Sequence, residues 1–208
     1  RLTGVFAGDL EKVLQEAVSK IKPYVEIPVE EEFDIVLTHG GYVGRNHYQA
    51  AKAAVGALPA VKANGVIVMA ADNRDPEPIG GPEYKTLNHL LKLQGVEGSV
   101  DLLRSPAWKF TKDQWEPEVW GRVLRKVGEE GLIYCTSDIP EKVFAMLPGV
   151  SGYEFLTPAG RKKARTQKVQ EMVQNAVIYS YSAYKRRQIT PRMAFIREGP
   201  YAVPIKKK

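Results

Sequence analysis

Short apolar runs alternate along the chain with longer segments in which apolar residues recur every three or four positions. The runs are continuous enough for strands buried on both faces, as in a parallel sheet, and the longer segments have helical spacing. We expect strands at about 33–37, 65–70, 132–136 and 192–196, and helices at about 9–20, 46–58, 83–93, 112–129, 141–147 and 158–187. This alternation predicts an α/β fold in which helices flank a mostly parallel sheet, with residues 1–208 as a single domain.

Capping and helix-breaking residues set several of these boundaries. Asp9 is a good cap for the first helix, and Pro23 is expected to end it. The pair Thr157-Pro158 favours a helix start at that point. The segment 72–82 carries three prolines and two glycines, so we expect a long loop of the kind that often has a function.

Composition narrows the class of protein. Hydrophobic residues make up 44% of the chain and charged residues 26%, which is ordinary for a soluble globular protein. No apolar run approaches the ~20 residues that span a bilayer, so we expect a cytoplasmic protein with no membrane partner. The single Cys135 leaves no internal disulfide and no multi-cysteine zinc site, and we expect it in the core. The chain begins with Arg1, which suggests a piece of a longer protein.

A net charge of +6 permits an anionic partner without requiring one. Basic residues gather at 161–165, 185–187 and 206–208, which solvated helix ends and a terminal triplet also explain. Nucleic acid is therefore an unlikely partner. The alternative that this charge leaves open is a basic α/β module that binds nucleic acid or an acidic protein. Its contact face would consist of Arg161, Lys162, Lys163, Arg165 and Lys168.

The most informative chemistry follows the first predicted strand. Gly40 and Gly41 come at its carboxyl end, where glycines let backbone N–H groups approach an anion and where ligands of open α/β sheets collect. Residues three and four apart share a helix face, so Tyr48, Gln49 and Lys52 can point into one cleft. An ammonium, an amide and a phenol suit a small carboxylate that bears a hydroxyl. A simple turn, a surface lysine and a tyrosine at the core rim would explain the same residues.

The three histidines, His39, His47 and His89, lack the four-residue spacing of a metal-binding pair. His39 and His47 flank the glycine loop and could meet in space. A hydrogen-bonded structural role is nevertheless expected for each of them. We find no nucleophile elbow and no phosphate-loop lysine motif, so the chain itself is predicted to carry neither catalytic residues nor a metal site.

The residues around the glycine pair resemble a known family. Gly40-Gly41-Tyr42, then Asn46, then the run Tyr48 to Lys52, are similar to the C-terminal domain of lactate racemase and its relatives, the nickel-pincer-nucleotide-dependent 2-hydroxyacid racemases and epimerases. Further similar segments follow in the family's order and extend the resemblance over most of the chain. They are Gly4–Asp9, Gly65–Val68, Asp113–Trp115 and Glu198–Pro204.

The resemblance implies a division of labour. In that family a nickel-bound carbon of the cofactor exchanges a hydride with the alcohol carbon, and two histidines exchange the hydroxyl proton. Cofactor and histidines belong to an N-terminal domain that this chain lacks, so no cofactor is expected in this chain alone. By matching position, Gln49 and Lys52 would hold the carboxylate of a small 2-hydroxy acid. Tyr48 would line the pocket, and Trp115 would wall the cleft and exclude water.

The resemblance also implies a partner and has departures. Segments 1–25 and 190–208 are expected to pack against the N-terminal domain, without which the chain should be inert. Val43 stands where the family usually has a proline, and Arg45 where its loop usually carries an acidic residue. The added positive charge of Arg45 suggests a substrate with a second carboxylate or a larger acid.

Overall fold

The structure, a computed structural model, describes residues 3–207. Its centre is a five-stranded sheet in the order β5-β4-β3-β2-β6, and every pairing in it is parallel. The strands are β2 (Phe33–His39), β3 (Val61–Ala70), β4 (Leu132–Cys135), β5 (Val150–Ser151) and β6 (Met193–Phe195). The predicted α/β class with a mostly parallel sheet is therefore confirmed. Arg1, Leu2 and Lys208, which belong to the predicted domain, lie outside the described residues.

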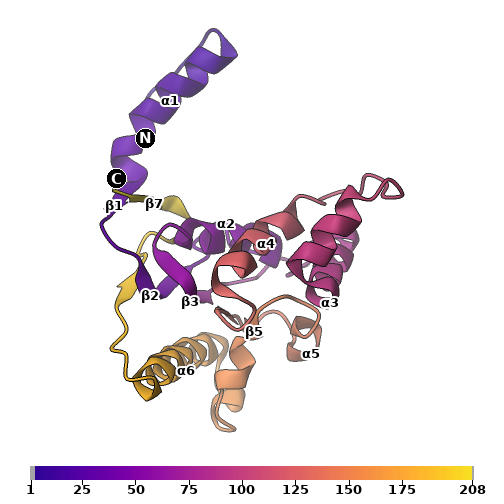
Figure 1. Ribbon diagram of the computed structural model, residues 1–208, viewed down its shortest axis with the longest axis vertical. Coiled ribbons are helices and arrows are strands. Elements are labelled where there is room, and N and C mark those ends of the chain that lie inside the picture. The colour runs from indigo at the N-terminus through magenta and orange to yellow at the C-terminus, as the bar shows by residue number, and fades with distance from the viewer. Residues whose placement is uncertain (1–2, 208) are drawn as a thin grey trace.

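Helices cover both faces of this sheet. On one face lie α2 (His47–Ala57) and α4 (Glu116–Val127), with α3 (Pro82–Arg104) packed against α4. On the other face lies α6 (Arg165–Arg186), below the strands in Figure 1. The short α5 (Glu141–Phe144) and the 3-10 turns η1 (Gly152–Phe155) and η2 (Gly160–Lys162) connect β4 to α6.

Alternate residues of the strands explain the two-sided core. Successive side chains of a strand point to opposite faces. Val36 and Met69 therefore belong to the cluster under α2 and α4. Their chain neighbours Ile35 and Val68 belong to the cluster that Met172 of α6 completes. Because both sides are covered, the strands read as continuous apolar runs, which is why the sequence reveals them.

Cys135 lies in the second of these clusters and is fully buried, as its sequence context predicts. Burial raises the pKa of its thiol to about 12. The thiolate is the reactive form of cysteine, so this side chain behaves as a small apolar core residue.

A second, two-stranded parallel sheet joins the two ends of the chain. It pairs β1 (Glu26–Val29) with β7 (Val203–Lys206), which follows the 3-10 turn η3 (Gly199–Tyr201). Helix α1 (Leu10–Val25) precedes β1 and extends away from the rest of the molecule (Figure 1). None of its residues is buried. Residues 3–25, the described part of the predicted segment 1–25, therefore contribute little to the hydrophobic core.

Several helix boundaries differ from the sequence-based prediction; α4, for example, begins at Glu116 instead of about residue 112. Helix α1 continues through Pro23 to Val25, because a proline so close to the helix end interrupts only the last turn. Helix α3 continues past residue 93 to Arg104, with a kink at Gly95, whose φ is 69°. Helix α6 begins at Arg165 instead of Pro158.

The late start of α6 has a tertiary cause. The carboxylate of Glu171 accepts hydrogen bonds from the backbone N–H of Thr157 at 3.0 Å and from its hydroxyl at 2.6 Å. The Lys163 ammonium donates to the same carboxylate at 2.6 Å. These bonds hold 157–163 as a turn folded back on the helix.

Among residues 3–207, no helix is long and apolar enough to cross a membrane.

Candidate functional site

The first turn of α2 is fixed entirely by bonds within the chain. Asn46 caps it, and its side-chain oxygen accepts from the backbone N–H of Gln49 at 2.9 Å. The N–H of His47 donates to Pro78 O at 2.8 Å, and that of Tyr48 donates to Ile79 O at 3.0 Å. The long loop 72–82 therefore serves to seat this helix. Its first N–H groups are not free to receive an anion.

The glycine pair is committed to the fold in the same way. Gly40 N–H donates to Ala70 O at 2.8 Å, and Gly41 N–H donates to the Nδ1 atom of His39 at 3.1 Å. The prediction that these N–H groups approach an anion is therefore wrong. Gly41 has a φ of 55°, and an added Cβ would lie 2.9 Å from the ring of Tyr201. Glycine is required here by backbone conformation and close packing.

Gln49 and Lys52 are joined on the surface of α2. The Lys52 ammonium donates to Oε1 of Gln49 at 2.5 Å. This bond leaves the amide N–H groups of Gln49 and the other N–H groups of Lys52 free to donate to a ligand. The pair therefore offers several N–H donors and one positive charge to an anionic ligand.

Tyr48 turns toward the start of α4. Its ring meets that of Tyr84 edge-on, with centroids 5.2 Å apart. Partial burial raises the pKa of its hydroxyl, and the negative charges of Glu116 and Asp113 add to the effect. Tyr48 is thus a half-buried side chain whose hydroxyl faces acidic groups.

Trp115 stands at the N-cap of α4, one residue before the helix, and not within it as predicted. The turn before it contains Asp113 in a left-handed conformation with a φ of 64°. The indole is 49% exposed. Trp115 is therefore not a core side chain, whereas Trp120 within α4 is fully buried.

Glu116, which the sequence reasoning missed, is the centre of this group. Its side chain is 9% exposed, and its Oε2 atom has no hydrogen-bond partner. Burial raises the pKa of its carboxyl above the usual value, and the negative charge of Asp113 adds to this, while the nearby polar groups of Trp115 and Tyr48 and the charge of Lys52 oppose it. The structure therefore brings Tyr48, Lys52 and Trp115 together around one buried acid. The one feature of the sequence that could have pointed to Glu116 is its position directly after the Asp113-Gln114-Trp115 segment.

Gly40 and Gly41 face a different hollow. They line about 290 Å³ of space at the start of α6, together with the charged residues Asp72, Arg74, Asp138 and Arg165. These charges are paired: Arg165 bonds to Asp138 and to Asp72, and Arg74 bonds to Asp72 at 2.6 Å. The glycines and the Tyr48-Gln49-Lys52 face therefore belong to different surroundings. The side chain of Arg45 is exposed in the loop between them.

Of the three histidines, His39 and His47 make contacts that stabilise the fold. His47 is fully buried, stacks on Trp120 with centroids 4.4 Å apart, and has its Nδ1 atom 2.7 Å from the Tyr84 hydroxyl. Burial lowers its pKa to about 3. The Nε2 atom of His39 lies 2.7 Å from Arg197 O. Within residues 3–207 no group of three or more His, Cys, Asp or Glu side chains is placed to hold a metal ion.

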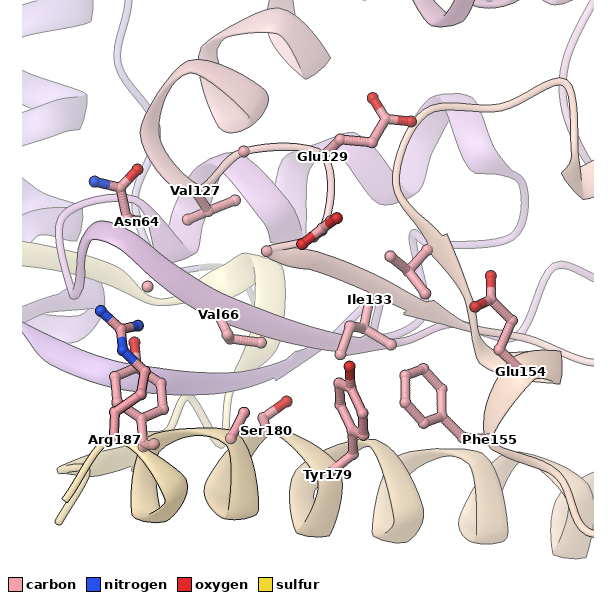
Figure 2. Close-up of a pocket in the computed structure, with 17 residues that line it drawn as sticks. Asn64, Val66, Val127, Glu129, Ile133, Glu154, Phe155, Tyr179, Ser180 and Arg187 are labelled. Carbon is pink, nitrogen blue, oxygen red and sulfur yellow. The ribbon is translucent and has the colours of Figure 1, made fainter. Parts of the chain in front are cut away.

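A larger hollow lies away from these groups, near the amino end of β4 and beside residues 64–66 of β3. It measures about 820 Å³ and lies between the sheet and the second half of α6. Figure 2 shows Val66 and Ile133 of the sheet facing Tyr179 and Phe155 across it. None of the candidate site residues lines it.

The basic face proposed for an alternative binding module is largely paired within the chain. Arg161 bonds to Glu141, Lys163 to Glu171, and Arg165 to Asp138. Arg161 and Lys163 also lie outside α6, so the five residues do not form a single helix face. These pairings count against that alternative.

Parallel strands with helices on both faces, and a polar cluster where α2 and α4 begin, define an open α/β domain of the class that collects ligands beyond the carboxyl ends of its strands. The family model for the lactate racemase C-terminal domain matches residues 29–177, and the chain belongs to this family.

Two relatives illustrate the match. The chain is 29% identical over 126 residues to a lactate racemase of Lactiplantibacillus plantarum, which covers 60% of this chain and 29% of that protein. The structure is similar to that of the lactate racemase apoprotein from Thermoanaerobacterium thermosaccharolyticum, with a TM-score of 0.68 and 17% identity. That match covers 99% of this chain and 43% of the other, so the chain spans less than half the length of these relatives.

Proposed function

We propose that this chain is the substrate-clamping part of a 2-hydroxyacid racemase or epimerase. The observation that carries the proposal is the meeting of Tyr48, Lys52 and Trp115 where α2 and α4 begin, in a chain of the lactate racemase C-terminal domain family. These are the side chains that the family resemblance assigns to the substrate.

Lys52 and Gln49 bind the substrate carboxylate. Because the first N–H groups of α2 are already bonded, side chains must supply the donors. The existing bond from Lys52 to Gln49 fixes both groups before the ligand arrives. A charge-assisted hydrogen bond contributes about 1.5–3 kcal/mol net, which suits millimolar-to-micromolar recognition of a metabolite.

Tyr48 and Trp115 complete the clamp. The half-buried Tyr48 ring forms the wall beside the ammonium, and the exposed Trp115 indole covers the ligand and excludes water. Lower local water content strengthens the interaction of Lys52 with the carboxylate. Gly40 and Gly41 contribute by holding the loop before α2 in a tight conformation and not by donating to the ligand.

The redox and acid–base chemistry belongs to the part of the enzyme that this chain lacks. When bound, the nickel-pincer nucleotide supplies the hydride acceptor for the alcohol carbon. The family resemblance places this cofactor in the N-terminal domain, and we assign it there. This chain's residues bind and orient the acid for it, and the chain by itself should not turn substrate over.

The N-terminal domain also explains the exposed apolar side chains of the chain ends. Leu10, Leu14, Val18 and Ile21 form an exposed stripe on α1, whose residues are all outside the core. An apolar groove of about 620 Å³ also lies between β1 and β6. The segments 3–25 and 190–207 pack against that domain. Adding it should protect α1 amides from hydrogen exchange, and unchanged exchange at α1 would contradict the contact.

The clamp is tested by titrating the chain with D- and L-2-hydroxy acids and following amide shifts by NMR. We expect shifts at Tyr48, Gln49 and Lys52, and a loss of affinity of about tenfold or more in Lys52→Ala, from the bond energy above. Lys142→Ala removes an exposed lysine of α5 and is the matched control. Equal losses in both variants, or no shifts in α2 at high ligand concentration, would refute the proposal.

A further inference from the structure

Glu116 is an acid set into the proposed carboxylate site. It lies in the first turn of α4. Among the carboxylate, lysine and arginine side chains of residues 3–207, it alone has a buried polar atom without a hydrogen-bond partner. The groups that face it are Tyr48 and Lys52 of α2, Tyr84 of α3, and Asp113 of the preceding turn. Lys52 is the single cation among them.

A bound 2-hydroxy acid would bring a second carboxylate to that cation. Two carboxylates that approach the same cation resist being ionised together, above all when one of them is buried, so one of them tends to hold a proton. The two groups then titrate as a coupled pair. The buried Glu116 carboxyl takes the proton, because its charged form is the less well solvated of the two.

We propose that Glu116 is a further binding residue of this site, which takes up a proton when the substrate carboxylate binds to Lys52 and Gln49. This inference rests on the function proposed above. Protonation removes the repulsion between Glu116 and the ligand and frees the full charge of Lys52 for the ligand.

The proposal fixes the sign of the pH dependence. If binding takes up a proton, affinity is lowest above the pKa of Glu116 in the complex, and it rises as the pH falls from that pKa toward the lower pKa of Glu116 in the free protein. Full uptake of one proton changes the affinity by about tenfold per pH unit. If Glu116 served only to hold Lys52 in place through an ion pair, affinity would instead fall as the pH falls. Protonation of Glu116 would then break the ion pair and leave Lys52 less well positioned for the ligand.

The test measures the side-chain carboxyl signal of Glu116 by carbon NMR in the wild-type chain, with and without a 2-hydroxy acid. We expect the ligand to raise the pKa of Glu116 by about one unit or more. Calorimetric titration in buffers of different ionisation enthalpy should show proton uptake on binding. If α2 residues shift with ligand while the pKa of Glu116 stays constant, this proposal is overturned and the clamp stands. If nothing in α2 shifts, the clamp itself fails.

Two variants give an independent measurement. Glu116→Gln mimics the protonated side chain, so it should bind the acid several-fold more tightly than wild type at about pH 7.5 and lose the pH dependence. Glu118→Gln, on the exposed side of the same helix, is the matched control and should retain the wild-type profile. Weaker binding of Glu116→Gln at every pH would overturn the proposal. The wild-type NMR measurement decides the matter if that variant does not fold.

Discussion

The Tyr84 hydroxyl links the core to the start of α2, and its removal should be costly. Trp120 Nε1–H donates to this oxygen at 2.9 Å, and the Nδ1 atom of His47 lies 2.7 Å from it. All three side chains are fully buried. Because the indole N–H takes an acceptor position on the Tyr84 oxygen, the hydroxyl proton is directed to His47. Tyr84→Phe therefore strands two buried polar groups with little change in shape.

The magnitude follows from those two groups. A buried donor or acceptor left without a partner costs about 1–3 kcal/mol, so with two such groups the free energy of unfolding should fall by roughly 2–6 kcal/mol. Urea unfolding followed by tryptophan fluorescence measures this directly. The exposed Tyr179→Phe is the control and should change stability by less than about 0.5 kcal/mol. A loss in Tyr84→Phe as small as that of the control would refute the reasoning.

A double-mutant cycle separates the indole bond from the histidine bond. Trp120→Phe removes the donor, and in that background Tyr84→Phe should cost less than it does alone, by about 0.5–3 kcal/mol of coupling. Additive losses would mean that the hydroxyl and the indole stabilise the protein independently, against the 2.9 Å bond between them.

Three further predictions follow from single side chains. Burial lowers the pKa of His47 to about 3, so the unfolded state binds a proton below about pH 6.5 that the folded state does not; stability should fall by about 1.4 kcal/mol per pH unit between about pH 6 and 3, and His47→Gln should flatten this slope in urea titrations. Glu171→Gln removes the acceptor charge that its Thr157 and Lys163 bonds use, so amides of 157–163 should exchange faster with solvent while the sheet is unchanged; equal protection would contradict the role given to this carboxylate. Gly41→Ala forces a side chain into a left-handed backbone position against Tyr201, so the melting temperature should drop by several degrees through a loss of about 1–2 kcal/mol, and an unchanged melting curve would argue against that strain.

The sequence by itself indicated four of the five strands of the main sheet, whereas β5 and the order of the strands came from the structure. A strand covered on both sides must be apolar at every position, so β2, β3 and β4 are legible as continuous runs. Helical periodicity placed α2 and the body of α4 for the same reason, because their buried faces recur with the helix turn. The spacing of Gln49 and Lys52 also predicted that these side chains share a face, and their 2.5 Å bond confirms it.

Only the tertiary structure decided which groups are free to act. Whether the N–H groups of Gly40 and Gly41 can meet a ligand depends on Ala70 and His39, which chain folding brings to them. Whether basic residues form a binding face depends on the acids that pair with them, such as Glu171 with Lys163. Spacing along the chain carries no information on such partners.

The same limit hid the acid at the centre of the candidate site. Glu116 follows Trp115 in a segment that reads as the start of an exposed helix, and nothing local marks it as buried. Its burial comes from the packing of α4 against α2 and α3, which encloses its carboxyl beside Tyr48 and Lys52. The types of side chain at the site are thus written in the sequence. Their solvation and charge are set by neighbours distant in the chain, because desolvation is a property of the packed fold.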